Sequence, residues 1–339
     1  MHLRIRRRRF GQIAIATFAS TALANLTGKT LAQEEESIIY GVSLGSNNGA
    51  TNGDRKVAAN IDANTTPVLT LVIFDLVSAR DLKTIQLPSV NVVDTTGAVN
   101  AVNTDSRNGR GETASKALYT EPSERITSFT PLSNNGFIVV SVASTKNGNF
   151  NRIIYVDSKS ERPQKALGAS GFQKVNGTIE SLAATKENSL IGVVSLNEGV
   201  PPFEVVNFDS NSAKLSRSNE LPLLSGSLRL SNLVVAPDNT IYATTLSAQN
   251  PTTIVQIDLA NKALVTGRGK VVRLSELKYN NKPLENDVLS LAVSKSGQLY
   301  ALANPSYEKV NSLFAVDIKS GEMKLLRKFA ADKIAFARG

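Results

Sequence analysis

Four charged residues and a threonine directly precede five short apolar segments that recur along the chain: Arg125, Thr178, Arg229, Asp287 and Asp332. Guanidinium groups bind carboxylates through paired hydrogen bonds, and carboxylates bind cations or transfer protons. If the five segments converge in space, these side chains form a rim of mixed charge that can bind a small ligand. The alternative is that they are solvated strand ends without a ligand, because charged residues are mostly exposed in any fold.

Five aspartates form a second recurring set, each at the end of another apolar run: Asp75, Asp157, Asp209, Asp258 and Asp317. An acidic set of this kind suggests calcium binding or carboxylate catalysis. Each aspartate stands, however, where one strand would turn into the next, and aspartate commonly accepts backbone N–H hydrogen bonds in such turns. One aspartate per repeat also places the five far apart. We therefore interpret them as turn caps rather than ligands.

The residue types that are missing exclude several kinds of chemistry. The chain has no cysteine and no tryptophan, and its single histidine is His2. A zinc site of cysteine and histidine, a thiolate nucleophile and a histidine-based triad are therefore excluded from the rest of the chain. The sequence predicts no cofactor, although it still permits calcium bound by oxygen ligands and acid–base chemistry between carboxylates.

The positive charge of the chain is concentrated at its N-terminus. The formal net charge is +9, from 38 basic and 29 acidic residues, but six of the basic residues lie in the first 32 positions, which hold no acidic residue. Without that segment, 32 basic residues face 29 acidic ones, a net charge of +3. This residual charge gives no electrostatic footprint for DNA or RNA, so we predict no nucleic-acid partner.

Residues 1–32 resemble an export signal. A basic stretch at 4–9 is followed by Phe10 and then by 18 uncharged residues, with Thr30-Leu31-Ala32 as a small-residue cleavage site. The run Arg7-Arg8-Arg9-Phe10 resembles the twin-arginine motif, although Gly and Gln follow the Phe where Leu and Lys are usual. An uncleaved membrane anchor and a disordered basic tail are the alternatives. We expect cleavage, a periplasmic or secreted bacterial protein, and no stable membrane span afterwards.

The remaining chain, residues 33–339, contains an internal repeat. Four segments pair an apolar run with a second run that starts 11 residues later, across a polar turn; the runs start at Ile126 and Phe137, Ile179 and Leu190, Leu230 and Ile241, and Val288 and Leu299. A third run ends in the recurring aspartate, and a fourth, more polar run closes each unit. Four antiparallel strands in about 50 residues is the blade of a β-propeller.

The two ends of the chain predict how the ring closes. The segment Ile38–Ser43 matches a second strand, but the mature chain has no room for a first strand before it. Lys333–Ala337 resembles an innermost strand and has no second strand after it. We therefore predict an all-β, five-bladed β-propeller closed by its C-terminal strand, with blades at approximately 333–339 plus 38–88, 124–168, 178–222, 229–267 and 286–329. An open solenoid of five units, or a sixth irregular blade at 89–123, are the alternatives.

The blade pattern resembles that of exported bacterial propellers of the YVTN/WD-like repeat class. The segments Gly297–Leu302 and Leu313–Gly321 match the signature Gly-x-Leu-Tyr-Ala-Leu followed by Leu-Phe-Ala-Val-Asp-x-x-x-Gly. This resemblance covers the mature chain and implies architecture only, because members of that class include binders, scaffolds and unrelated enzymes.

A column of small residues aligns in the innermost strands: Ser128, Ser181, Asn232, Ser290 and Ala335. Crowding at the propeller axis explains it, and a polar channel is the alternative. The strand order places long connections on one face only, at 45–67, 89–123, 168–178 and 268–287, and loops of this length are usually functional or disordered. Tyr40, Tyr242 and Tyr300 are expected in the core.

These observations favour a monomeric, non-enzymatic propeller that binds a partner protein or a small ligand on its loop-rich face. The rim residues Arg125, Arg229, Asp287 and Asp332 are the candidate ligand-binding groups, and no catalytic or metal-binding residue is assigned. The alternative is a carboxylate-dependent glycoside or lactone hydrolase on the same scaffold. The lack of tryptophan, the best residue for stacking on sugars, weighs against the enzyme.

Overall fold

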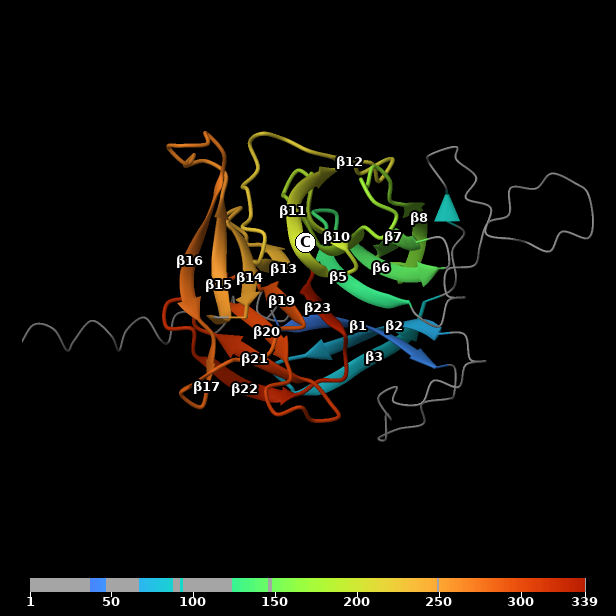
Figure 1. Cartoon of the computed structure of the whole chain (residues 1–339). Helices are drawn as coiled ribbons and strands as arrows, with labels where there is room; N and C mark the ends of the chain where they lie inside the picture. Colours follow the sequence, from blue (N-terminus) through green and yellow to red (C-terminus); the bar gives the residue numbers. More distant parts are fainter. Residues whose placement is uncertain are drawn as a thin grey trace, which may run out of the picture.

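The computed structural model describes residues 37–46, 67–87, 92–93, 124–145, 148–248 and 250–338. These residues contain strands and no helix, arranged as five antiparallel sheets of four strands around a common axis, which is a five-bladed β-propeller (Figure 1). The export signal expected at 1–32 lies outside the described residues. Among the described residues, no helix is long and apolar enough to cross a membrane.

Each blade runs from an innermost to an outermost strand. Blade 1 consists of β23 (Lys333–Phe336), β1 (Ile38–Ser46), β2 (Pro67–Asp75) and β3 (Arg80–Gln86). Blade 2 consists of β5 (Arg125–Pro131), β6 (Phe137–Thr145), β7 (Gly148–Asp157) and β8 (Arg162–Gly168), and blade 3 of β9 (Thr178–Ala184), β10 (Leu190–Asn197), β11 (Val200–Phe208) and β12 (Leu215–Ser216). Blade 4 consists of β13 (Arg229–Val235), β14 (Ile241–Ser247), β15 (Asn250–Asp258) and β16 (Lys270–Glu276), and blade 5 of β19 (Ser290–Val293), β20 (Leu299–Ala303), β21 (Ser312–Val316) and β22 (Met323–Lys328).

The polar turns at the 11-residue offset join the first two strands of blades 2 to 5. Asn135, Asn188, Asn239 and Gly297 in these turns have φ between 59° and 86°. Asparagine and glycine tolerate this left-handed conformation better than other residues do, and it allows the chain to reverse within a few residues. The turn chemistry therefore favours the observed pairing of the innermost strand with the second strand in blades 2 to 5.

The C-terminal strand closes the ring, as predicted. β23 pairs antiparallel with β1, with Tyr40 opposite Ala335 and Val42 opposite Lys333. Just before β23, the amide of Asp332 donates a 2.8 Å hydrogen bond to Val42 O. Closure gives β1 a partner on its inner side and removes an exposed sheet edge.

Two connections differ from the expected pattern. Of the segment 89–123, the structure describes β4 (Val92–Val93), which adds in parallel to the outer edge of β8 in blade 2 and forms no sixth blade. The outer strand of blade 4, β16, lies beyond the expected limit at residue 267, because residues 259–269 form a long connection before it. The rest of the expected 268–287 insertion contains a hairpin, β17 (Lys278–Tyr279) with β18 (Lys282–Pro283).

The recurring aspartates are turn caps, as predicted. Asp209 Oδ1 accepts hydrogen bonds from the amides of Asn211 and Ser212 at 3.0 and 2.7 Å, and Asp317 Oδ1 accepts one from the amide of Lys319 at 2.9 Å. Asp75, Asp157 and Asp258 make equivalent bonds. Hydrogen bonds to the carboxylate favour its charged form, and the pKa of all five carboxyls lies below its ordinary value.

The column of small residues connects neighbouring blades by hydrogen bonds. Ser128 Oγ donates to Leu182 O at 2.8 Å and accepts from Leu182 N at 3.0 Å, so that blade 2 is tied to blade 3. Ser181, Asn232 and Ser290 make comparable bonds to backbone atoms of the next inner strand, at Leu233 N, Val288 O and Ile334 N. Each innermost strand is a sheet edge with unpaired backbone groups, and these side chains satisfy some of them. Crowding alone is therefore an incomplete explanation of the column.

Apolar side chains fill the spaces between blades. One cluster joins Val42 and Leu71 of blade 1 to Phe137 and Ile154 of blade 2, and similar clusters fill the other junctions. The three tyrosines are partly buried against these clusters, as expected. The propeller thus holds the ends of its inner strands around one axis.

Candidate functional site

A cavity of about 620 Å³ opens at the end of the axis where the inner strands begin. Its walls are formed by residues that begin or precede β5, β9, β13, β19 and β23, one strand from each blade. They include four acidic and three basic side chains: Glu124, Glu180, Asp287, Asp332, Arg125, Arg229 and Lys333. A cavity of this size lies in the range that holds small organic molecules.

The axis narrows sharply below this cavity. Residues further along the inner strands, such as Phe129, Leu233 and Ile334, line a space of only about 10 Å³. Near that end Arg338 donates a 2.9 Å hydrogen bond to Val235 O. The cavity is therefore a funnel with a polar mouth and an apolar, nearly filled stem.

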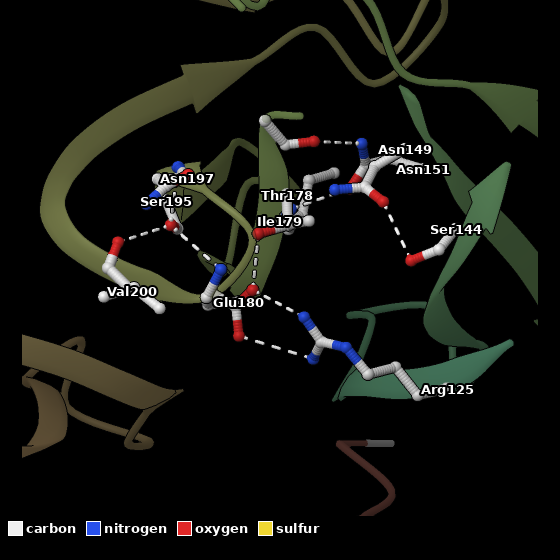
Figure 2. A network of polar contacts seen from close by, with 12 residues as sticks. Arg125, Ser144, Asn149, Asn151, Thr178, Ile179, Glu180, Ser195, Asn197 and Val200 are labelled. Carbon is white, nitrogen blue, oxygen red and sulfur yellow. Dashed lines mark hydrogen bonds and ion pairs between the residues drawn. The ribbon is translucent and has the colours of Figure 1, made fainter. Parts of the chain in front are cut away.

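Arg125 and Glu180 form a well-aligned ion pair across blades 2 and 3 (Figure 2). Arg125 Nη2 donates to Glu180 Oε1 at 2.7 Å, and Nη1 donates to Oε2 at 3.4 Å. The Glu180 side chain is 5% exposed and that of Arg125 is 47% exposed. Burial on its own would raise the pKa of Glu180, but the hydrogen bonds and charge of Arg125 outweigh it and hold the pKa below its ordinary value.

Asn151 holds the start of β9 and thereby places Glu180. This buried side chain of blade 2 accepts a 2.7 Å hydrogen bond from Ile179 N and donates one of 2.9 Å to Gly177 O (Figure 2). Thr178 is 1% exposed and donates to Glu180 Oε1 at 2.6 Å. Thr178 therefore orients Glu180 and does not face a ligand, in contrast to its expected place on the rim.

The pair on the other side of the cavity is poorly aligned. Arg229 Nε of blade 4 lies 3.3 Å from Asp287 Oδ2 of blade 5, and neither Nε nor Oδ1 has a hydrogen-bond partner among the described residues. The Asp287 side chain is 19% exposed. Its burial raises the pKa of the carboxyl, against the opposing charges of Arg229 and Lys333. Asp287 is therefore a partly satisfied carboxylate at the cavity wall.

Unsatisfied polar atoms are concentrated at this cavity. Seven buried side-chain polar atoms have no hydrogen-bond partner among the described residues, and four of them belong to residues lining the cavity: Glu124 Oε2, Thr127 Oγ1, Arg229 Nε and Asp287 Oδ1. Buried polar groups are nearly always hydrogen-bonded, and leaving one without a partner costs about 1–3 kcal/mol. The wall of the cavity therefore carries polar atoms whose hydrogen-bonding capacity the described residues do not satisfy.

Glu124 also belongs to a buried ion pair behind the cavity wall. Its Oε1 pairs with Arg152 and accepts a 2.6 Å hydrogen bond from the hydroxyl of Ser141. The side chains of Glu124 and Arg152 are 0% and 1% exposed, and the guanidinium carbon of Arg152 lies 5.0 Å from the centre of the Phe150 ring. This arrangement fixes Glu124 and leaves its buried Oε2 without a hydrogen-bond partner among the described residues.

Asp332 and Lys333 occupy the closing strand. Asp332 Oδ2 accepts a 2.9 Å hydrogen bond from Leu44 N, which links β1 to the residue just before β23. Lys333 donates to Leu289 O of blade 5. Burial lowers the pKa of Lys333 to about 8, although the carboxylates of Asp287, Glu180 and Asp332 oppose this shift. A partly neutral amine thus faces the same cavity.

The structure places all four candidate ligand-binding residues, Arg125, Arg229, Asp287 and Asp332, at this one cavity. Sequence reasoning missed Glu124, Glu180 and Lys333. A signal for Glu180 was present, because a glutamate lies within an otherwise apolar or small innermost strand, where burial requires a partner. Its partner, Arg125, lies 55 residues away, and only the closed ring shows the pairing.

Two features of the acidic residues bear on metal binding, namely the role of the five turn aspartates and the spacing of the other carboxylates. The five turn aspartates each serve their own turn, so they form no calcium ring. Within the described ranges, no group of three or more acidic or histidine side chains could hold a metal ion. The carboxylates at the cavity come from different blades, and three of them, Glu124, Glu180 and Asp287, pair with arginines.

Comparison with known proteins establishes neither a family nor a function. No protein-family model and no curated protein matches the chain. Similar solved structures include a protein of unknown function from Bacteroides caccae (11% identity over 89% of this chain and 99% of that one, TM-score 0.44). They also include Kuenenia stuttgartiensis hydrazine synthase, with 11% identity over 79% of this chain and 80% of that one and a TM-score of 0.39. Puromycin hydrolase has 11% identity over 76% of this chain and 36% of that one and a TM-score of 0.37. At TM-scores below 0.5 these likenesses support no conclusion about function, so the residues of the chain itself must carry the functional argument.

Proposed function

We propose that this protein is an exported, non-enzymatic β-propeller that binds a small polar molecule in the axial cavity. The observation that carries the proposal is the group of unsatisfied polar atoms, which includes Arg229 Nε and Asp287 Oδ1, in a cavity of about 620 Å³. A ligand that offers both donors and acceptors would satisfy them. The sequence also predicts long connections on one face of the propeller, and binding residues are commonly found on such loops.

The charges at the cavity define the ligand further. Four carboxylates and three cations line it, and Arg152 behind the wall balances Glu124, so the site has little net charge. Such a site gives no advantage to a strongly charged ligand. Three of the four unsatisfied atoms are acceptors or hydroxyls, at Glu124, Thr127 and Asp287. We therefore propose a neutral, hydroxyl-rich molecule, such as a small polyol or sugar, in preference to a phosphate or a polyamine.

The proposal is tested by titrating the purified mature protein with a panel of polyols, monosaccharides, amino acids and sugar phosphates, using calorimetry and thermal shift. We expect neutral hydroxylated compounds to raise Tm, and we expect Asp287→Asn and Thr127→Val to weaken that binding by about 10-fold, or about 1.4 kcal/mol. The matched control is Arg217→Gln, which breaks the surface ion pair with Glu204 on the outside of blade 3 and should leave binding unchanged.

Binding confined to sugar phosphates, or binding equally affected by the surface variant, would contradict the proposed ligand class. If no compound of the panel binds and a protein partner from the same compartment binds in a manner that depends on Asp287 and Arg229, the site is an interface and the small-ligand proposal is wrong.

The raised pKa of Asp287 favours one alternative, a carboxylate-dependent hydrolase in which this group donates a proton. Chromogenic glycosides and lactones test it directly. Turnover by the wild-type protein that disappears in Asp287→Asn or Asp332→Asn would favour the enzyme over the binder.

A further inference from the structure

Lys333 is the one lysine that lines the axial cavity. It begins the closing strand β23 and is fixed in place by its pairing with Val42. Its Nζ donates to the carbonyl of Leu289 in blade 5, and no ion pair with a carboxylate is formed by this amine among the described residues. The residue is partly exposed and belongs to the wall of the cavity.

The surroundings of Lys333 favour the neutral amine, which is the nucleophilic form. Burial lowers its pKa to about 8 even though Asp287, Glu180 and Asp332 lie near enough to oppose the shift. About a quarter of such groups are neutral at pH 7.5, compared with about one in a thousand for a lysine of ordinary pKa. Buried lysines with this property are the ones that form Schiff bases in enzymes.

We propose that Lys333 captures small hydroxylated aldehydes in the axial cavity as a reversible imine. The hydroxyl groups of such a molecule would meet the unsatisfied atoms of Glu124, Thr127 and Asp287, and its carbonyl carbon would meet Nζ. This inference rests on one part of the proposed function, namely that a hydroxylated molecule enters the cavity. It adds a covalent step that the binding of a polyol does not need.

The chemical step balances without an oxidant or a reductant. The lone pair of the neutral amine forms a bond to the carbonyl carbon, and a proton moves from nitrogen to the former carbonyl oxygen to give a carbinolamine. The carboxyl of Asp287, whose pKa is raised by burial, then donates a proton to this hydroxyl. The C–O bond breaks, water leaves, and the nitrogen lone pair forms the C=N bond. Addition of water in the reverse direction releases the aldehyde.

The test uses glycolaldehyde with sodium cyanoborohydride, which reduces an imine to a stable secondary amine. The intact wild-type protein is incubated at pH 7.5, and each lysine is quantified by peptide mass spectrometry. We expect Lys333 to be modified at least about 10-fold faster than surface lysines such as Lys83, and this preference to fall as the pH is raised from 8 toward 10.5, where surface lysines also become neutral. Equal labelling of Lys333 and the surface lysines would overturn the proposal.

A matched set of variants separates this inference from the proposed function. Lys333→Arg removes the amine, so it should abolish the fast-labelled site. Asp287→Asn should slow the labelling of Lys333. If polyols fail to bind anywhere but Lys333 is labelled selectively, the proposed function is wrong and the covalent site stands. If polyols bind and Lys333 labels like a surface lysine, only the present inference is wrong.

Discussion

The hydrogen bonds between inner strands give a sharp prediction for the change Ser128→Ala. Ser128 is buried, and its hydroxyl makes two bonds to Leu182 in the neighbouring blade, at 2.8 and 3.0 Å. Alanine removes both bonds and leaves the N–H and C=O of Leu182 at a sheet edge next to the nearly filled stem of the axis.

The size of the effect follows from the number of groups left without a partner. An unsatisfied buried donor or acceptor costs about 1–3 kcal/mol, and partial access to water reduces this, so we expect a loss of about 2–3 kcal/mol in the free energy of unfolding. In a domain of this size that loss lowers Tm by about 5 °C. Ser181→Ala removes one bond, to Leu233 N at 2.6 Å, and should cost about half as much. Urea unfolding followed by circular dichroism and calorimetry measures both.

The neighbouring residue supplies the control. Thr127 is buried, but its hydroxyl has no hydrogen-bond partner among the residues that the structure describes. Thr127→Val keeps the shape of the side chain and should leave the unfolding free energy within about 0.5 kcal/mol of the wild-type value, or raise it. If Ser128→Ala and Thr127→Val shift Tm by the same amount, the bonds between blades contribute nothing, and crowding alone explains the small residues.

Three further predictions concern charged groups. Glu124→Gln leaves Arg152 as a buried cation without its carboxylate and should cost about 3–5 kcal/mol in urea unfolding, whereas Glu204→Gln in the surface pair should cost less than about 1 kcal/mol. Hydrogen bonds from Ser78, Ser37 and Val77 lower the pKa of Asp75 to about 2. The stabilising effect of this carboxylate is therefore complete above its ordinary pKa of 3.8 and is lost as the pH falls toward 2. The difference in Tm between the wild-type protein and Asp75→Asn should shrink over that range. Lys333 has a pKa of about 8 in the folded protein and 10.5 when unfolded, so the unfolded state binds more protons between these two pH values. The Tm of the wild-type protein should therefore rise relative to that of Lys333→Met as the pH increases from 8 to 10.5. If the two proteins show parallel pH profiles of Tm, the low pKa of Lys333 is wrong.

The architecture could be predicted from the sequence because it depends on local pattern. The 11-residue offset, the turn asparagines and the terminal aspartates each act within a few residues, and they locate most strands of blades 2 to 5. The closing strand was predictable for a different reason. Ile334–Ala337 has the pattern of an innermost strand, and only one blade lacked such a strand.

The parts that could not be predicted depend on distant residues. The sequence identifies Arg125 and Arg229 as members of one rim, but the good alignment of the first with Glu180 and the poor alignment of the second with Asp287 arise from the rotation between blades. The position of β16 was missed because residues 259–269 separate it from β15 by more than a tight turn. Its apolar pattern is also weak, since an outermost strand is largely exposed.

The junction at which the chain closes differs from the others in the forces that hold it. Four members of the inner column hydrogen-bond to the next blade, but the fifth is Ala335, which has no polar side chain to offer blade 2. Aromatic packing occupies that junction instead: the ring of Phe137 lies 4.7 Å from that of Tyr40 and 5.0 Å from that of Phe129, in the cluster that contains Ala335. Apolar contacts are non-directional, so the packing between β23 and blade 2 does not require one fixed orientation of β23. The antiparallel pairing with β1 and the Ser290 bond from blade 5 already fix its register. The small size of Ala335 matters for the same reason, because a larger side chain would displace the aromatic rings that take the place of the missing hydrogen bond.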